Sequence, residues 1–273
     1  GGAVAKGFSE AGSKVAVVDI DQAQCDEFAQ ELGPQHAGFG VDLTDTARLS
    51  SLVEKIDSTL GKIDVLVNIA GVIKRADDLF QVSESDFDFQ MDINVKVPFF
   101  LSQAVAKLMV DDGRSGVIIN YSSQGWMSGG FGGSVVYNAG KGAITTMTRG
   151  LARSWADHGI RVNSVAPGLV ETPMLGLDRM SGGQIENMVG GIPLKRLAQP
   201  GDHTGATLFL ASDHAAYMTG ATINVSGGFS NVMLCVSSIA ITNQTITQTF
   251  VQLDKNAHWF LKGVGGAGTQ KGT

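Results

Sequence analysis

The stretch VYNAGKGAITTMTRGLARSWADHGIRVNSV, residues 136–165, contains the helix-then-strand unit on which the fold prediction depends. Its first part, Val136–His158, has an apolar stripe at four-residue spacing and predicts a helix. Gly159 stands where a glycine commonly ends a helix, and Val162–Val165 is a short apolar run typical of a buried strand. Similar helix and strand patterns alternate along most of the chain, which predicts an α/β fold.

The remaining apolar patterns predict further helices and strands on both sides of this unit. The helices are expected at Ala3–Ala11 (ended by Gly12), Gln22–Leu32, Thr46–Leu60 and Phe87–Val110, and the strands at Val15–Val18, Val65–Val67, Val117–Asn120 and Ala221–Val225. Such alternation predicts a parallel sheet with helices on both faces. Ligands of these sheets bind beyond the carboxyl ends of the strands, so the residues that follow each strand are the candidates for a site.

Length, composition and charge exclude several classes of function. The chain has 273 residues, 43% of them hydrophobic and 17% charged, which fits one large α/β domain or two small ones. The formal net charge is -6 and no long basic run occurs, so nucleic acid is not an expected partner. The apolar tract Val232–Thr242 is shorter than the roughly 20 residues of a membrane-spanning helix, so no membrane partner is expected.

Cysteine and histidine usage bears on compartment and metal binding. Cys25 and Cys235 form no CxxC pair and suit a reducing compartment better than a disulfide framework. No secretory signal pattern is present, so the cytoplasm is the expected location. The five histidines show no metal-binding spacing such as HExxH, and no metal site is expected.

Tyr137-Asn-Ala-Gly-Lys141 is the strongest candidate for chemistry. A tyrosine and a lysine four residues apart lie on one face of a helix. An unperturbed tyrosine has a pKa near ~10, and a cation held close to the phenol lowers that pKa. A surface tyrosine beside a solvated lysine is the ordinary alternative, and the pair alone would favour it.

Three polar segments follow the strands of the amino-terminal half. Asp19 could accept hydrogen bonds from a ribose diol and repel a 2'-phosphate, or it could cap the helix that begins near Gln22. Asp42-Leu43 follows the run Ala37–Val41 and could frame an adenine or cap a helix. Asn68-Ile-Ala-Gly71 would let a ligand approach the backbone closely, or it could be a plain turn.

Three more candidates lie in the second half of the pattern. Ser122-Ser123 follows a strand, where a hydroxyl could bind a substrate oxygen or cap a loop. Asn94 lies inside a predicted helix, where asparagine is mildly unfavourable, although an exposed asparagine is common. Pro167-Gly-Leu-Val170-Glu-Thr172 follows the strand Val162–Val165 and could cap or contact a ligand.

Taken in order, these segments resemble the short-chain dehydrogenase/reductase family. The ordered set is Asp19, Asp42-Leu43, Asn68-Ile-Ala-Gly71, Asn94, Ser123, Tyr137-Asn-Ala-Gly-Lys141, and Pro167-Gly168 with Thr172. The resemblance implies a Rossmann-type, doubly wound parallel sheet over residues 1–230. It also implies a nicotinamide cofactor, with NAD favoured over NADP by Asp19.

The resemblance implies catalytic roles for four residues. Tyr137 would exchange a proton with the substrate oxygen, and Lys141 would lower the pKa of Tyr137 and bind the nicotinamide ribose. Ser123 would orient the substrate, and Asn94 would hold a water in the proton relay. The cofactor would be bound by Gly1, Asp19, Asp42, Leu43, Asn68, Ala70, Gly71, Tyr137, Lys141, Pro167, Gly168, Val170 and Thr172.

The chain departs from the family pattern at both ends. The family opens with a strand and a glycine loop, and Gly1 aligns with the last glycine of that loop, so we expect a truncation that removes the first strand and most of the loop. Residues 231–273 form an atypical extension. A disordered or wrongly joined tail would explain it, and so would a circular permutation in which Trp259–Leu261 and the loop at 263–268 replace the first strand.

The segments Asn68–Arg75 and Phe87–Gln103 resemble the sugar-acid and polyol dehydrogenases of the family. The sequence therefore predicts an NAD-dependent oxidoreductase that interconverts a secondary alcohol and a ketone. Lys74 and Arg75 could attract a carboxylate or simply be solvated. A 3-oxoacyl reductase is one alternative, and an inactive fragment that acts only in binding or oligomerisation is another. The family's packing implies a homo-oligomer, either a tetramer or a dimer.

Overall fold

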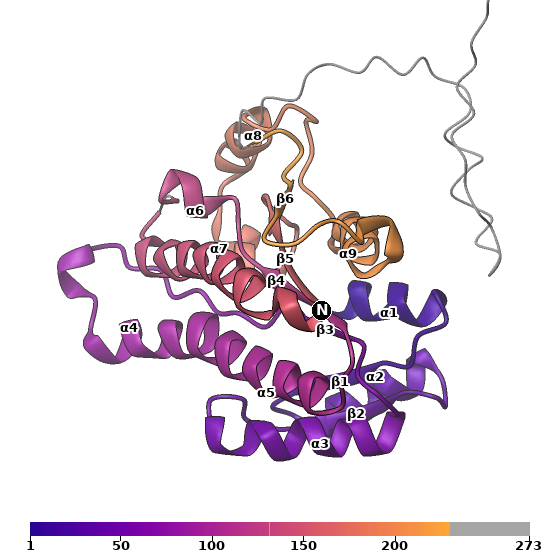
Figure 1. Cartoon of the computed structure of the whole chain (residues 1–273). Helices are drawn as coiled ribbons and strands as arrows, with labels where there is room; N and C mark the ends of the chain where they lie inside the picture. Colours follow the sequence, from indigo (N-terminus) through magenta and orange to yellow (C-terminus); the bar gives the residue numbers. More distant parts are fainter. Residues whose placement is uncertain (131, 230–273) are drawn as a thin grey trace, which may run out of the picture. The chain divides into compact units, whose positions relative to one another are not determined.

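The computed structural model describes residues 1–130 and 132–229 (Figure 1). The helices are α1 (Gly2–Glu10), α2 (Gln22–Leu32), α3 (Leu49–Leu60), α4 (Glu84–Met91), α5 (Val97–Asp111), α6 (Gly125–Ser128), α7 (Val135–Trp155), α8 (Gly182–Gly190) and α9 (Thr204–Ala211). The strands are β1 (Ala16–Asp19), β2 (Ala37–Gly40), β3 (Val65–Asn68), β4 (Gly116–Tyr121), β5 (Ile160–Pro167) and β6 (Thr222–Val225). The α/β prediction is confirmed.

The strands form two parallel sheets, β1-β2 and β3-β4-β5-β6. In the described residues no strand joins β1 to β3, so the parallel strands that the sequence predicts are divided between two sheets. Within the larger sheet the register pairs Val65 with Val117 and Val117 with Arg161. The strands therefore end together, and the residues that follow β3, β4 and β5 share one edge.

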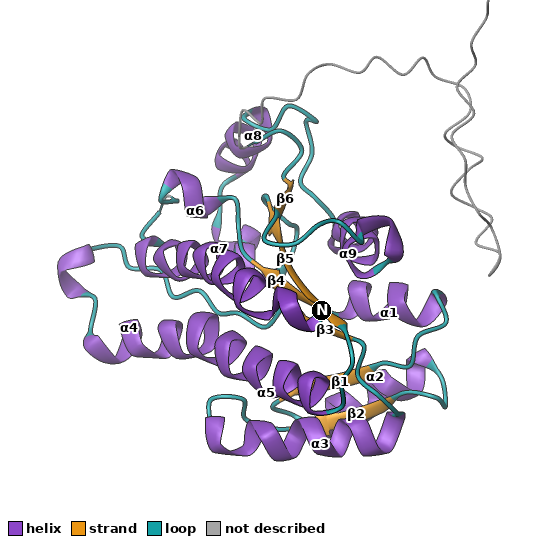
Figure 2. Ribbon diagram, in the orientation of Figure 1, coloured by secondary structure: helices purple, strands orange, loops and turns teal. Residues whose placement is uncertain are grey.

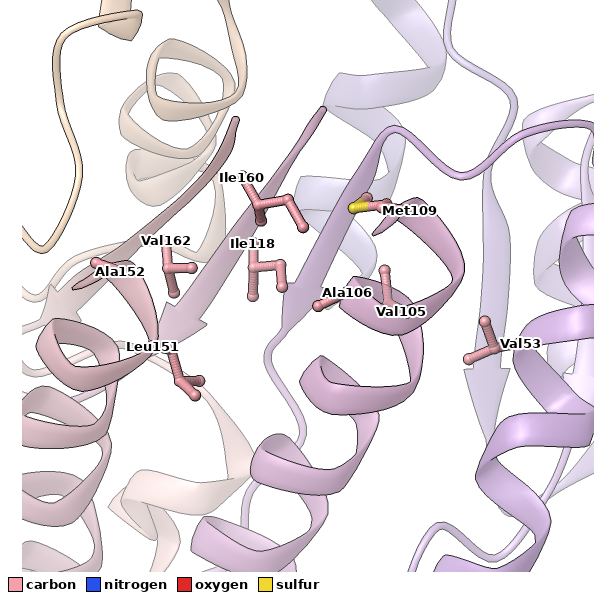
Figure 3. Close-up of a cluster of buried hydrophobic side chains, with 9 residues drawn as sticks. All are labelled: Val53, Val105, Ala106, Met109, Ile118, Leu151, Ala152, Ile160 and Val162. Carbon is pink, nitrogen blue, oxygen red and sulfur yellow. The ribbon is translucent and has the colours of Figure 1, made fainter. Parts of the chain in front are cut away.

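Helices cover both faces of the larger sheet, as a doubly wound arrangement requires (Figure 2). On one face, α5 and α7 pack on β4 and β5 in a cluster that Figure 3 shows. Its members are Val53, Val105, Ala106, Met109, Ile118, Leu151, Ala152, Ile160 and Val162. On the other face, Val4 of α1 and Leu210 of α9 pack against Ile119 and Val165.

Strand β4 contributes side chains to the hydrophobic clusters on both faces of the larger sheet. In β4, Val117, Ile119 and Tyr121 face α1 and α9, whereas Ile118 belongs to the cluster under α5 and α7, because successive side chains of a strand point to opposite faces. Asn120 is two residues after Ile118 and so points toward the same helices. Its amide donates to the Thr148 hydroxyl of α7 at 3.0 Å.

Two departures from the predicted helices have identifiable causes. The predicted helix Phe87–Val110 is divided by a π-helical turn at Asp92–Lys96, since Pro98 has no N–H to donate to the carbonyl of Asn94 four residues earlier. Helices α8 and α9 were not predicted, because α8 begins Gly-Gly and α9 is apolar on most of its surface. The extension at 231–273 and the circular permutation lie outside the described residues.

One continuous helical stretch, Glu84–Asp111, is long and apolar enough to cross a membrane by length and composition alone. Val105, Ala106 and Met109 of this stretch are buried in the cluster on β4 and β5. A helix of a protein core has the same composition, and this packing explains the apolar residues without a membrane.

Buried His203 provides a test of the packing beside α9. The side chain is 3% exposed, and its Nε2 is the one buried side-chain nitrogen or oxygen of the described residues without a hydrogen-bond partner. Burial lowers the pKa of His203, and the backbone of Pro200 and Val225 opposes this effect. The unfolded chain would bind a proton near pH 6.5 that the folded chain does not bind, so the free energy of unfolding should fall as pH drops through that value.

We expect His203→Leu to change the free energy of unfolding at pH 8 by no more than about 1 kcal/mol, because it removes an unsatisfied buried nitrogen together with the ring's contacts to the backbone of Pro200 and Val225. The variant should also lose part of the decrease in stability below pH 6.5. Urea denaturation between pH 5 and pH 8 measures both effects, with the exposed His214→Gln as the matched control. An unchanged acid slope in His203→Leu would contradict the assignment.

Candidate active site

Ser123, Tyr137 and Lys141 meet at the carboxyl edge of the larger sheet. Ser123 follows β4, and Tyr137 and Lys141 lie one turn apart near the start of α7. The Ser123 hydroxyl lies close enough to the Tyr137 phenol to lower the pKa of that phenol. The Nζ of Lys141 lies 5.6 Å from the centre of the Tyr137 ring. The structure therefore brings these three predicted residues together.

Lys141 is buried, with 4% of its surface exposed. Its Nζ donates a hydrogen bond to the carbonyl of Tyr121 at the end of β4, at 2.8 Å. The Ser122 hydroxyl in turn donates to the Lys141 carbonyl at 2.9 Å. Burial lowers the pKa of Lys141 to about 8, so the amine is mostly charged at neutral pH. These contacts hold a cation beneath the phenol.

The electrostatics of Tyr137 differ from the expectation. Burial raises the pKa of its phenol, while the hydrogen bond with Ser123 and the charge of Arg75 lower it. The sequence predicts a net lowering caused by Lys141. The net direction here is upward because burial of the ring outweighs the opposing effects, and the Lys141 ammonium is directed at the Tyr121 carbonyl.

Asn94 is fully buried in the π-helical turn. Its side chain and that of Lys141 both approach the backbone of Gly71. Its Oδ1 accepts from the backbone N–H of Val72 at 3.0 Å, and its Nδ2 donates to the carbonyl of Val72 at 2.7 Å. A Cβ added at Gly71 would lie 3.0 Å from Asn94 Oδ1 and 3.4 Å from Lys141 Nζ. Glycine therefore keeps this junction open.

Asn68 lies at the end of β3, but its side chain is used inside the protein. Its Nδ2 donates to the hydroxyl of Ser102 at 3.0 Å and to Oδ1 of Asn120 at 2.8 Å. This buried network ties β3 and β4 to α5, so the side chain supports the strand ends. The neighbouring Ala70 is exposed and Gly71 is half-buried.

Asp19 and Gly1 lie close to each other at the end of β1. Asp19 is exposed and its Oδ1 accepts from the N–H of Ile20 at 2.7 Å. The alternative role as a helix cap falls to Asp21, whose carboxylate accepts from Ala23 and Gln24 at the start of α2. Burial lowers the pKa of the Gly1 amino group, and the Asp19 carboxylate opposes that shift.

Asp42 forms a local turn after β2. Its Oδ1 accepts from the N–H of Thr44 at 2.9 Å and from the Thr44 hydroxyl at 2.7 Å. The hydrogen bonds from Thr44 lower the pKa of Asp42, and Arg48 adds to this effect. Leu43 is half-buried against the cluster on α3. Asp42 therefore closes a turn and does not cap a helix, because the N-cap of the helical turn Thr46–Arg48 is Asp45.

The segment after β5 requires a glycine. A Cβ at Gly168 would lie 2.6 Å from the Cα of Ser226, because Pro167 and Gly168 pack directly on the end of β6. Val170 forms a parallel bridge with Ala198. The Thr172 hydroxyl donates to the Val170 carbonyl at 3.4 Å, a long contact.

Arg75 belongs to the site more clearly than the sequence alone indicates. Its side chain is exposed, but its charge acts on the Tyr137 phenol. Its Nη1 donates to the carbonyl of Gly132 at 3.4 Å, and the adjacent Ala76 N–H donates to the carbonyl of Gly133 at 3.1 Å. A Cβ at Gly133, where φ is +70°, would lie 1.9 Å from the Ala76 carbonyl oxygen.

The cluster is suited to proton transfer. It combines a titratable phenol, a neighbouring hydroxyl, a buried ammonium and a guanidinium at one edge of the sheet. Within residues 1–130 and 132–229, no three His, Cys, Asp or Glu side chains are grouped as metal ligands would be.

Comparison with known proteins identifies relatives over most of the chain. A family model described as enoyl-(acyl carrier protein) reductase matches residues 1–230. The 2-dehydro-3-deoxy-D-gluconate 5-dehydrogenase of Dickeya dadantii is 36% identical over 230 residues, which cover 84% of this chain and 90% of that protein. The galactitol 2-dehydrogenase of Agrobacterium fabrum is 34% identical and covers 82% and 90%.

A solved structure is similar as well. Sorbitol-6-phosphate 2-dehydrogenase from Erwinia amylovora superposes with a TM-score of 0.78 at 33% identity. The match covers 84% of this chain and 94% of that one. The relatives' names include a sugar acid, a phosphorylated sugar alcohol and an uncharged sugar alcohol.

Proposed function

We propose a mechanism and a substrate class for this chain, which belongs to the short-chain dehydrogenase/reductase family. Like its relatives it is an oxidoreductase that interconverts a secondary alcohol and a ketone with a nicotinamide cofactor. The observation that carries the proposed mechanism is the cluster of Ser123, Tyr137 and Lys141 at one strand edge. The proposed substrate is a sugar acid or a polyol.

Tyr137 is the proposed acid and base. When an alcohol is oxidised, the phenol oxygen takes the hydroxyl proton of the substrate, and in reduction it returns that proton to the ketone oxygen. The Ser123 hydroxyl, which lies near the phenol and lowers its pKa, orients the substrate oxygen. The charge of Arg75 lowers the pKa of the phenol, and we propose that the Lys141 ammonium adds to this effect when cofactor and substrate are bound. Proton transfer from a positioned group typically contributes ~10²–10⁴-fold in rate.

Asn94 and the π-helical turn support the proton path. The Asn94 side chain is held on Val72, beside Gly71 and within reach of Lys141. We propose that a water on this buried junction passes the proton of Tyr137 onward through Lys141. The asparagine would then act mainly by shaping this junction, because both of its side-chain hydrogen bonds are with Val72.

The proposed cofactor residues fit a dinucleotide. Gly71 and Gly168 stand where a Cβ would crowd its surroundings, and Ala70 is exposed beside them. Asp19 presents a carboxylate at the end of β1, with Gly1 at the amino end of α1 nearby. Bound there, the nicotinamide supplies the hydride chemistry. Leu43, Val170 and Thr172 complete the proposed binding set, with Asn68 and Asp42 as supports.

Arg75 favours an anionic substrate. A guanidinium beside the reacting hydroxyl is suited to a carboxylate or a phosphate, which it can bind in a fork geometry. The relatives named for 2-dehydro-3-deoxy-D-gluconate and sorbitol 6-phosphate act on compounds with such a group. We propose a sugar acid as the first substrate to test.

We propose that the protein forms a homo-oligomer. A mostly apolar depression lies between α4, α5 and α7 and is lined by Met91, Val95, Phe99 and Met147. Such a surface suits a second copy of the chain in a dimer or a tetramer.

We propose the cytoplasm as the location of the protein. The buried free thiol of Cys25 is compatible with that reducing compartment.

Replacing Tyr137 by Phe should lower kcat at least ~100-fold, since the proton acceptor is lost, while the Kd for NAD stays within about twofold. Turnover is measured as NADH formation from 2-dehydro-3-deoxy-D-gluconate, and binding by calorimetry. The matched control is Tyr217→Phe, because Tyr217 is fully exposed. Retained turnover in Tyr137→Phe would refute the role.

Asp19 should make the protein prefer NAD. At 100 times its Kd, NAD should raise the free energy of unfolding by about 2.7 kcal/mol, while NADP at the same concentration gives a smaller rise in Tm. Asp19→Ser should narrow this difference, whereas Asp157→Ser, at another exposed position, should not. A larger stabilisation by NADP in the wild type would overturn the preference.

Replacing Arg75 by Gln should lower kcat/KM about 10-fold for 2-dehydro-3-deoxy-D-gluconate or for sorbitol 6-phosphate, the size of one charge-assisted hydrogen bond. The kcat/KM for uncharged galactitol should change much less. The ratio of kcat/KM between the charged substrates and galactitol therefore reports how much Arg75 contributes to binding the anionic group. The neighbouring Lys74→Gln is the charge-matched control. An equal loss for all three substrates would count against anion recognition.

A further inference from the structure

Three side chains at four-residue spacing on one helical stretch bind the same short segment of chain. Asn94 bonds both backbone groups of Val72. Gln90 Oε1 accepts from the backbone N–H of Lys74 at 2.9 Å. Asp86 forms an ion pair with the Lys74 ammonium. Residues four apart share a helix face, so these three form a polar ladder along Val72–Lys74.

The rungs of this ladder differ in burial. Asn94 and Gln90 are 0% and 1% exposed, whereas Lys74 and Asp86 keep 56% and 31% of their side chains exposed. Exposed ion pairs contribute little, and a buried hydrogen bond is costly to lose. Gln90 is therefore the decisive contact on Lys74, the residue next to Arg75.

The Gln90 amide is itself oriented by its own helix. Its Nε2 donates to the carbonyl of Asp86 at 3.3 Å, which leaves Oε1 directed at the Lys74 N–H. On the other side of Arg75, the Ala76 N–H is bonded to the carbonyl of Gly133. Arg75 thus lies between two residues whose backbone N–H groups are both fixed.

We propose that Gln90 is a positioning residue that holds Arg75 against the turn at Gly132 and Gly133, which leads into the helix of Tyr137, by fixing the backbone of Lys74. The inference rests on the proposed function of Arg75 as the residue that binds the anionic group of the substrate. Gln90 touches neither substrate nor cofactor, and it acts on the reaction only through the chain segment that it holds.

The kinetic test uses Gln90→Met, which keeps the shape and removes the acceptor, and Gln90→Glu, which keeps an acceptor for the Lys74 N–H. With 2-dehydro-3-deoxy-D-gluconate and NAD, Gln90→Met should lower kcat/KM roughly 3- to 10-fold, the size of one hydrogen bond, with the KM for NAD unchanged. Gln90→Glu should restore most of the loss. In an Arg75→Gln background, Gln90→Met should add less than about twofold, because both changes remove the same interaction.

Hydrogen exchange supplies a readout that does not depend on turnover. Gln90→Met should speed exchange of the Lys74 and Ala76 amides roughly 3- to 10-fold, and Gln90→Glu should not. Unchanged exchange at Ala76, or a full additional loss in the double variant, would overturn the proposal. A wrong assignment of Arg75 would give a different result. Arg75→Gln would then leave the preference for the acidic substrate unchanged, while Gln90→Met would still speed exchange of the Lys74 and Ala76 amides.

Discussion

The buried ammonium of Lys141 is the constraint on which the site depends. A charged amine in a protein interior is costly unless it is hydrogen-bonded, and here the Tyr121 carbonyl at the end of β4 meets that need. This contact fixes the first turns of α7 against the strand. It also explains why Tyr137, one turn earlier on the helix, lies beside Ser123, which follows the same strand.

Much of this arrangement can be predicted from sequence because it is periodic and local. The stripe of α7, the left-handed glycine at 159 and the apolar run of β5 each have a one-dimensional signature. The carboxyl-edge rule then locates Ser123 and Pro167-Gly168. Two predicted residues make internal contacts: Asn68 belongs to a buried network and Asp42 forms an exposed turn. These uses could not be told from ligand contacts, because both require the same residue type at the same strand end.

Other features depend on contacts between distant segments. The division into two sheets follows from which strands find partners, and no local pattern encodes that. In the sequence, Arg75 resembles a solvated surface residue. The structure shows that the glycine-rich turn at 132–133 packs on it. The spacing of Asp86, Gln90 and Asn94 was visible in the sequence, and three polar residues on one face of an apolar helix are the signal that could have pointed to the ladder. The π-helical turn was equally open to prediction, from Pro98 four residues after Asn94.

The central claim is that an alcohol oxygen reacts between Ser123 and Tyr137 while Arg75 binds an acidic group of the same molecule. A crystal structure with NADH and 2-dehydro-3-deoxy-D-gluconate tests it most directly, because NADH is already reduced and cannot accept a hydride from the alcohol that is to be oxidised. The account predicts a substrate hydroxyl within roughly 2.6–3.2 Å of the Tyr137 oxygen and the carboxylate on Arg75. A sugar acid bound with no hydroxyl near Tyr137 would contradict it.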